Sequence, residues 1–420
     1  METRLAGQSS EIDAISRLVL KTGRLLLVSG ADAEYVRRRT TLLVSRLGVD
    51  AELFISGERI LLTVDAGTSY RTRIGRQIVT MGINTGLFDD VDAVIDSILT
   101  GEIDVTQAAG RLESVEKSPP LRSAWLVIPT VAATTAALCR LFGADCPVVL
   151  AAFLGGILSI IVRRFLAARS VNPIAASFVT AFLSAMAAAL LLRLSPGAQP
   201  ALALVAAGMI LVPGVPLING VADVAGGHPG IGLSRLTTGL VTVVTVGFAL
   251  FLAAYVSAEP LPVFLETQPL PVWQDIIFSA VAALGFSLLF NSPARAVLAC
   301  VVCGTISHGL RTELTSQGLD LATATLLCSM IAGLIAHAAS RQLSLPWPTF
   351  AFPGTVAMIP GSYVFRAGVG GLEIMTKGSA TPPGILAETA SLAITAMVLT
   401  ACVGIGLLVA SSFSASLDRP

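Results

Sequence analysis

The last 300 of the 420 residues carry very few charges, and this feature restricts the chain to a membrane-embedded fold. Residues 1–120 hold 31 of the 54 acidic and basic side chains, which leaves 23 for the rest of the chain. The chain is 54% hydrophobic and 13% charged, which is too apolar for a soluble globular protein. We therefore expect a polar amino-terminal domain followed by a membrane domain.

Charge-poor stretches in the membrane domain give ten candidate spans. They are 123–139, 146–162, 170–192, 200–222, 236–258, 276–294, 296–310, 321–340, 342–365 and 384–413. About 20 apolar residues cross the core of a bilayer, so 296–310 is the weakest candidate. The expected fold is a mainly α-helical polytopic membrane protein with about ten transmembrane helices.

Two of these hydrophobic stretches are interrupted by proline and glycine. The first interruption, Pro213-Gly214, lies within 209–219, and the second, Pro360-Gly361, lies within 356–365. Proline removes a helical hydrogen bond and clashes with the preceding turn, so both spans should be discontinuous. Lipid cannot satisfy the freed backbone groups, and such breaks in corresponding positions of two repeats indicate the binding site of a secondary transporter.

The spans form two groups of five that align at a lag of 148 residues. Identical residues at this lag are Trp125 with Trp273, Gly156 with Gly304, Ser159 with Ser307, Arg163 with Arg311 and Arg193 with Arg341. The two Pro-Gly pairs align at a lag of 147. Because five is an odd number, the second group must enter the membrane upside down, which predicts two inverted five-span repeats.

Positive charge favours a cytoplasmic amino terminus. With that orientation the inner connections carry eight Lys or Arg residues and the outer ones five. The connection 259–275 has three acidic residues and no Lys or Arg, and we expect it outside. The predicted organisation is a cytoplasmic α+β domain (1–118), a first membrane half (119–258), this external connection (259–275) and a second membrane half (276–413).

The amino-terminal domain should combine helices with a β-hairpin. Apolar spacing predicts helices over 11–28, 31–47, 89–99 and 105–115, and a hairpin of 51–56 with 59–65. Asp89 and Asp90 are interpreted as helix-capping residues. The domain has no His or Cys, the chain has only three lysines, and no phosphate-binding loop occurs. We expect neither an enzyme nor ATP-driven transport, and no cofactor.

Polar residues near the two breaks are the candidates for substrate binding and coupling. The amide of Asn219 suits a zwitterionic ligand, and Asp223 is the first candidate for proton coupling, with a surface-loop role as the alternative. The predicted substrate pathway comprises Pro213, Gly214, Pro216, Asn219, Pro353, Gly354, Pro360, Gly361, Ser362, Tyr363 and Arg366. Arg366 either pairs with a carboxylate or extends to the membrane surface.

Three further ionisable residues are candidates for proton coupling. Glu388 begins the last span, and His308 and His337 lie within spans, where packing is the alternative role. We expect no metal site, because the three histidines are scattered and Cys300-Val-Val-Cys303 fits packing within a helix. A net charge of zero gives no reason to expect a nucleic-acid partner.

The segment Leu211–Asp223, followed by Gly232-Leu-Ser-Arg235, resembles the signature of the threonine/serine exporter family. Ser29–Glu34, Gly82–Asn84 and Pro119-Pro120 resemble the cytoplasmic domain of that family. Residues 272–372, which include Phe352-Pro353-Gly354, resemble the smaller second component, here fused to the first.

This resemblance implies a multi-pass exporter of the inner (plasma) membrane that moves small hydroxy amino acids, threonine or serine, with the proton gradient. Two alternatives stay open. An exporter of small dicarboxylates such as succinate would give Arg366 more importance than Asn219, and a membrane-anchored enzyme would act through the amino-terminal domain. The expected partners are the small-molecule substrate, protons and lipid, and the sequence leaves a homo-oligomer open.

Overall fold

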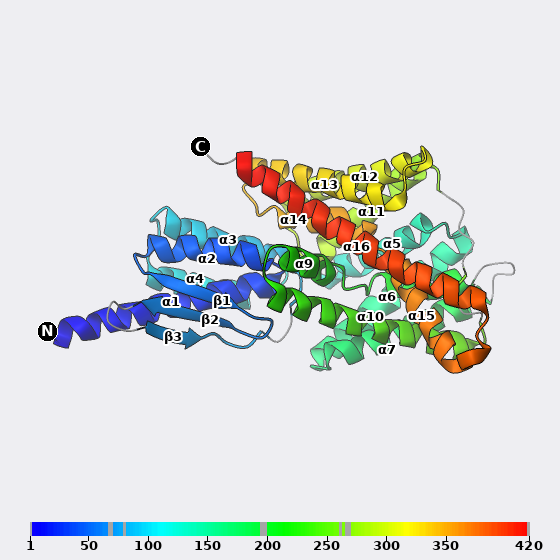
Figure 1. Ribbon diagram of the computed structural model, residues 1–420, viewed down its shortest axis with the longest axis horizontal. Helices are drawn as coiled ribbons and strands as arrows, with labels where there is room; N and C mark the ends of the chain where they lie inside the picture. Colours follow the sequence, from blue (N-terminus) through cyan, green and yellow to red (C-terminus); the bar gives the residue numbers. More distant parts are fainter. Residues whose placement is uncertain are drawn as a thin grey trace.

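The computed structural model describes residues 2–65, 70–78, 81–193, 200–259, 263–264 and 270–417. It is elongated, with the amino-terminal domain at one end and the long apolar helices at the other (Figure 1). Within the predicted external connection 259–275, residues 260–262 and 265–269 lie outside the described residues.

The amino-terminal domain packs helices against a small antiparallel sheet. Its elements are α1 (Glu2–Ser29), α2 (Ala33–Arg46), β1 (Ala51–Ile55), β2 (Ile60–Asp65), β3 (Tyr70–Ile74), α3 (Thr85–Leu99) and α4 (Val105–Lys117). The sheet order is β1-β2-β3, and Leu53 pairs with Leu62 at the centre of the first two strands. Leu26, Leu62 and Phe88 are buried in the shared core, since each projects from the inner face of its element.

The hairpin of β1 and β2 and the four predicted helices of this domain are present. The strand β3 was not predicted, because its sequence Tyr-Arg-Thr-Arg-Ile is mostly exposed and carries two arginines. The capping role of Asp89 and Asp90 is wrong: α3 begins four residues earlier, and the Asn84 side chain accepts a hydrogen bond from the Leu87 amide at 3.0 Å.

The membrane domain consists of apolar helices. They are α5 (Ala124–Leu141), α6 (Cys146–Ala168), α7 (Pro173–Leu192), α8 (Pro200–Met209), α9 (Gly214–Ala225), α10 (Pro229–Ser257), α11 (Val272–Leu289), α12 (Ala294–Ser316), α13 (Leu321–Leu343), α14 (Pro348–Thr355), α15 (Gly361–Lys377) and α16 (Pro383–Leu417). Among the described residues, seven of these helices are long and apolar enough to cross a membrane. The protein is therefore a mainly helical, polytopic membrane protein.

The other membrane helices are too short or too polar to be counted among these seven spans. The helix α12 is long enough, at 23 residues, but Arg295, Arg311 and Glu313 lower its hydropathy. The short helices α8 and α9 follow one another across Pro213, and α14 and α15 follow one another across a 3₁₀ turn, η1 (Val356–Met358), and Pro360. Both interruptions lie where the sequence predicts discontinuous spans.

The long helices pack in the same order in α5–α10 and in α11–α16, which we call membrane halves one and two. In half one α5 packs on α6, α6 on α7, and α7 on α10; in half two α11 packs on α12, α12 on α13, and α13 on α16. The two halves meet where α5 packs on α11, and in two reciprocal contacts, α10 with α15 and α9 with α16.

The aligned glycines Gly156 and Gly304 occupy matching close contacts. A Cβ atom on Gly156 would lie 2.9 Å from the Cα of Ala132 and 2.8 Å from the hydroxyl of Thr135. One on Gly304 would lie 2.5 Å from the Cβ of Ala283, the residue that corresponds to Thr135 at the lag of 148. Glycine at both positions lets α6 and α12 approach their neighbours closely.

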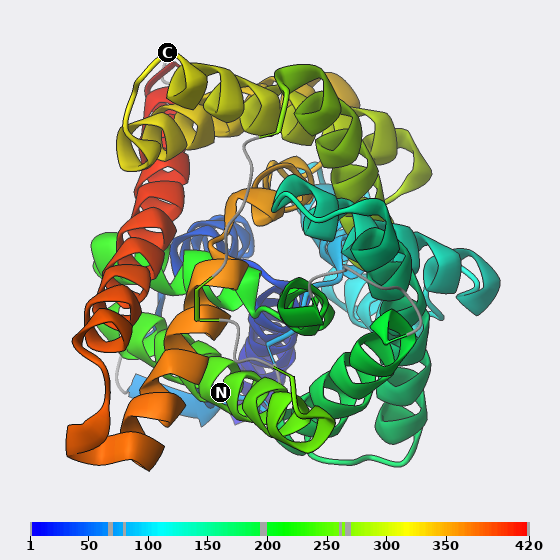
Figure 2. The ribbon, with the colours of Figure 1, turned by 90° about the vertical axis from the view of Figure 1, so that its right-hand side faces the viewer.

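The helices α10 and α16 run in opposite directions along the molecule. In Figure 1, α10 begins beside the amino-terminal domain and runs away from it, whereas α16 begins at the far end and returns toward the domain. Viewed along the long axis, the short helices α8 and α14 lie inside a ring of longer helices (Figure 2). The short helices of the interrupted spans are thus surrounded by protein, as the backbone groups at a break require.

Candidate functional site

The two interruptions have the same backbone geometry. Pro213 has φ −77° and ψ 59°, and Pro360 has φ −77° and ψ 52°. At each proline the following glycine amide donates back across the turn: Gly214 to the Val212 carbonyl at 2.8 Å and Gly361 to the Ile359 carbonyl at 2.7 Å. These are inverse γ-turns, and each one begins a new helix at the glycine.

The two turns pack against each other in a reciprocal way. A Cβ atom on Gly214 would lie 2.2 Å from the Cδ1 of Ile359, and one on Gly361 would lie 2.7 Å from the Cγ2 of Val212. Val212 and Ile359 correspond at the same lag of 147 as the two glycines. Each break therefore presses a β-branched side chain onto the glycine of the other.

A small apolar cavity lies beside this contact. It has a volume of about 20 Å³ and is lined by Leu138, Phe142, Met209, Val212, Phe286, Val356, Ala357, Ile359 and Gly361. That volume holds a single water-sized molecule, so the conformation is closed around the breaks. The residues that line the cavity are all apolar or glycine.

Only part of the predicted pathway gathers at this contact. Pro213, Gly214, Pro360 and Gly361 form it, and Pro216 follows on α9. Pro353 and Gly354 lie inside α14, where Gly354 packs on α12 and its carbonyl accepts a hydrogen bond from Ser307 at 2.9 Å. Ser362 is buried one residue after the second break, and Tyr363 is partly buried beside it.

Asn219 and Asp223 contact the amino-terminal domain. The Asn219 amide donates to the Gly30 carbonyl at 2.7 Å, and Asp223 accepts from the Ala33 amide at 2.7 Å. Arg235 on α10 donates to Asp223 at 2.7 Å and to the Ala31 carbonyl at 2.6 Å. Asp223 and Arg235 are 2% and 3% exposed, so this ion pair is shielded from water.

The docked segment is the turn between α1 and α2, Ser29–Glu34, which we call the docking loop. Gly30 has φ +113°, a conformation that favours glycine, and it packs beside Phe352 of α14. At the edge of the loop, Glu34 accepts from His228 at 3.2 Å. Burial opposes ionisation of Glu34, but hydrogen bonds from Arg37 and His228 outweigh it and lower its pKa.

A second contact joins the domain to half two. Thr85 donates its amide to the Phe290 carbonyl at 2.9 Å, and Asn291 donates to the side chain of Asn84 at 2.8 Å. Nearby, Arg295 lies 3.3 Å from Asp89. Burial raises the pKa of Asp89 to about 6, although Arg295 acts in the opposite direction.

Arg366 and Glu388, which the sequence singled out separately, form one ion pair at 3.1 Å. Arg366 also donates to the Val263 carbonyl at 2.7 Å, so its guanidinium is already engaged. His337 stacks on Trp347, with ring centroids 4.8 Å apart, and bonds to the Gly333 carbonyl. This environment fits the packing alternative for His337.

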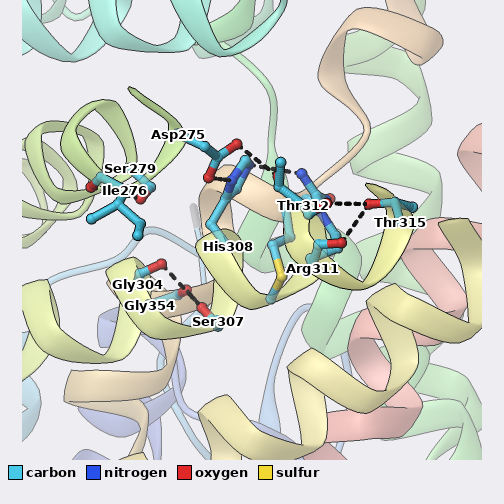
Figure 3. Close-up of polar contacts among 11 residues, drawn as sticks. Asp275, Ile276, Ser279, Gly304, Ser307, His308, Arg311, Thr312, Thr315 and Gly354 are labelled. Atoms are coloured by element: carbon cyan, nitrogen blue, oxygen red, sulfur yellow. Dashed lines mark hydrogen bonds and ion pairs between the residues drawn. The ribbon is translucent and has the colours of Figure 1, made fainter. Parts of the chain in front are cut away.

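His308 belongs to a buried polar cluster that sequence reasoning identified only in part. Its Nδ1 lies 2.7 Å from Asp275, and its Nε2 lies 2.7 Å from the Arg311 guanidinium (Figure 3). Thr312 donates to the other Asp275 oxygen at 2.7 Å. Asp275 was missed because it falls at the edge of the predicted external connection, although an acidic residue beside a span was the available signal.

A polar domain docked on an apolar helix bundle, with two interrupted spans in contact inside it, defines a polytopic membrane transport protein. Sequence comparison gives the family. Models of the threonine/serine exporter family match residues 17–257 and, for the second component, 275–413. The chain belongs to the threonine/serine exporter family, as the sequence motifs predict, and it is a transporter and not an enzyme.

Two curated relatives each match about half of the chain. One is described as a probable succinate transporter subunit, YjjP, of Klebsiella aerogenes; it is 30% identical over 55% of this chain and 89% of its own length. The protein of the same description from Escherichia coli is 30% identical over 54% of this chain and 89% of its own length. No solved structure matches the chain.

Proposed function

We propose that this protein is a secondary transporter that exports threonine, serine or a similar small hydroxy amino acid across the inner (plasma) membrane, driven by the proton gradient. The observation that carries this proposal is the reciprocal contact of the two breaks. The first backbone amides of α9 and α15, which begin at these breaks, can bind the carboxylate of an amino acid, and the last carbonyls of α8 can bind its ammonium. Ser362 adds a hydroxyl beside the second break.

The packing of the two halves supports a ten-span, inverted-repeat architecture. Each half contributes four continuous helices and one interrupted span, with the same order of neighbours. Trp125 and Trp273, which begin α5 and α11, are both exposed, as expected for aromatic residues at opposite membrane interfaces. In such a repeat the two halves exchange conformations, which opens the central site first to one side and then to the other.

The contacts of Asn219, Asp223 and Arg235 support a gating role for the docking loop. These side chains come from α9 and α10 and bind the loop of the domain that we place in the cytoplasm. While the loop is docked, it covers the cytoplasmic ends of α9 and α14. We therefore assign Asp223 to this gate and not to proton binding.

Efflux from proteoliposomes tests the transport proposal directly. Vesicles that contain the full chain are loaded with labelled threonine, serine or succinate, and a pH gradient, acidic outside, is imposed. One pH unit supplies about 1.4 kcal/mol per proton, enough for about a tenfold substrate ratio. We expect rapid efflux of threonine and serine that a protonophore abolishes. Efflux equal to that of protein-free vesicles for all three compounds would disprove the proposal.

Succinate is the second candidate, because two relatives that match about half of the chain carry that description. A dicarboxylate needs a second cationic partner in the site, and Arg366 is bound to Glu388 in this conformation. Succinate efflux that exceeds threonine efflux, and that is lost in Arg366→Gln, would favour this second function.

Orientation can be tested with a native cysteine. Cys146 begins α6 and is exposed, whereas Cys139, Cys300, Cys303 and Cys328 are buried. With the domain in the cytoplasm, Cys146 faces outward, and a membrane-impermeant maleimide should label it in intact cells. Cys146→Ser should remove that label, and Ser118→Cys added to this variant should be labelled only after permeabilisation. Labelling of Ser118→Cys in intact cells would reverse the orientation.

A further inference from the structure

The strongest unassigned feature is the polar cluster of Asp275, His308 and Arg311, which lies within membrane half two. Asp275 comes from α11, and His308 and Arg311 lie one turn apart on α12 (Figure 3). Asp275 and His308 are 2% and 4% exposed. Ionisable groups are costly at membrane depth, and a chain of them linked through a histidine is typical of a proton pathway.

The hydrogen bonds define the protonation state of His308. A guanidinium can only donate, so Arg311 donates to Nε2, which must carry a lone pair. The proton of the neutral ring is then on Nδ1, which donates to Asp275. The Nε2 atom is therefore the ring atom that can accept a proton, and its lone pair now accepts the hydrogen bond from Arg311.

Protonation at Nε2 would break the contact with Arg311. The new N–H bond removes the acceptor, and two cations would then face each other at 2.7 Å. Arg311 would have to move, while the imidazolium keeps its bond to the Asp275 carboxylate. The cluster thus has two alternative arrangements, which differ by one proton and by the position of one guanidinium.

Arg311 also connects this cluster to the second break. It donates to the Met358 carbonyl at 3.3 Å, two residues before Pro360. Ser307, one residue before His308, donates to the Gly354 carbonyl at 2.9 Å, so α12 holds the backbone of α14 as well. Displacement of Arg311 would therefore act on the turn that contacts Gly214 and Val212.

The first half has no counterpart of this cluster. At the lag of 148, Arg163 corresponds to Arg311, but Val127 and Ile160 stand where half two has Asp275 and His308. The breaks themselves are matched in both halves. A feature present in only one half is suited to the coupling ion, whereas the matched breaks are suited to the substrate.

We propose that Nε2 of His308 is the proton-binding site that couples the gradient to movement of the second break; this rests on the proposed transport function. The groups in direct contact within the cluster are Asp275 on α11, Arg311 and Thr312 on α12, and the Met358 carbonyl of η1. Cys328 on α13 and Tyr363 on α15 interact with Arg311 electrostatically. A proton from outside binds Nε2, the Arg311–His308 bond breaks, and release of the proton to the cytoplasm restores it.

His308→Gln in the full-length protein tests the coupling. Glutamine can accept from Arg311 and donate to Asp275 but does not bind a proton near neutral pH. We expect substrate exchange without a gradient to stay within about twofold, and gradient-driven efflux to fall about tenfold or more and to lose its pH dependence. His337→Gln, at the stacked histidine, is the matched control and should keep the gradient response.

Asp275→Asn gives a second measurement. It keeps the acceptor for Nδ1 but removes the charge that stabilises an imidazolium, so the midpoint of the pH profile should shift down by about one unit or more. Normal gradient-driven efflux in His308→Gln, or equal loss of exchange and driven efflux, would overturn the coupling role. An unchanged midpoint of the pH profile in Asp275→Asn would also overturn the coupling role of His308. If the unaltered protein moves no substrate, the transport proposal itself fails.

Discussion

Leucine in place of Gly214 or Gly361 should reduce export about tenfold or more, because neither break has room for a side chain. A Cβ atom alone would lie 2.2 Å from Ile359 at Gly214 and 2.7 Å from Val212 at Gly361. Ordinary overpacking costs about 1–3 kcal/mol, and here the added atoms separate the two turns that are proposed to hold the substrate. We expect both variants to lower the rate of threonine exchange as well as gradient-driven efflux.

A matched control lies on the same helix as Gly361. A Cβ atom on Gly371 would meet nothing within 4 Å, so Gly371→Leu adds the same side chain to α15 without a clash. It should retain export close to that of the unaltered protein. Full export by Gly214→Leu and Gly361→Leu, at equal protein levels in the membrane, would show that the contact between the breaks is not part of the transport path.

Much of the membrane domain could be predicted from local sequence. Charge-poor stretches of sufficient length have few stable structures in lipid other than a helix, so the long helices follow from composition. The interruptions also follow from local chemistry, because Pro213 and Pro360 prevent a continuous helix. In the domain, the exposed strand β3 lacks the alternating apolar pattern that would predict it. The cap of α3 is Asn84, whereas negative charge alone favours Asp89 and Asp90.

The contacts of the polar side chains could not be predicted in the same way. Asp275 and His308 are 33 residues apart on different helices, and no local pattern indicates that they meet. Asn219 and Asp223 bind a loop that is about 190 residues earlier in the chain. Proximity to a break suggested a role in substrate binding or coupling, whereas their partners depend on how the domain docks on the bundle.

Arg235→Ala should be the most destabilising single change at the docking loop. It leaves the Asp223 carboxylate buried beside the loop without its cation, and removing one partner of a buried pair costs about 3–5 kcal/mol. The Ala31 carbonyl also loses its donor. We expect a lower melting temperature and faster hydrogen exchange at the Ala33 amide, which bonds to Asp223.

Two variants separate charge from shape in this contact. Asp223→Asn combined with Arg235→Gln keeps an acceptor for Ala33 and a donor for Ala31 without buried charge, and it should recover most of the lost stability. Arg295→Ala removes a more exposed contact with the same domain, the pair with Asp89, and should cost less than about 1 kcal/mol.

The same Arg235→Ala variant distinguishes a gate from a structural anchor. If the docked loop closes the cytoplasmic end of the interrupted spans, loosening it favours the open state, because any change that destabilises the closed state shifts the equilibrium away from it. Threonine exchange per folded protein should then rise, measured below the melting temperature of the variant. The double variant Asp223→Asn, Arg235→Gln should return the rate of threonine exchange toward that of the unaltered protein. An exchange rate that merely follows the folded fraction would instead identify Asp223 and Arg235 as an anchor for the domain, and closure would have to be sought at the breaks themselves.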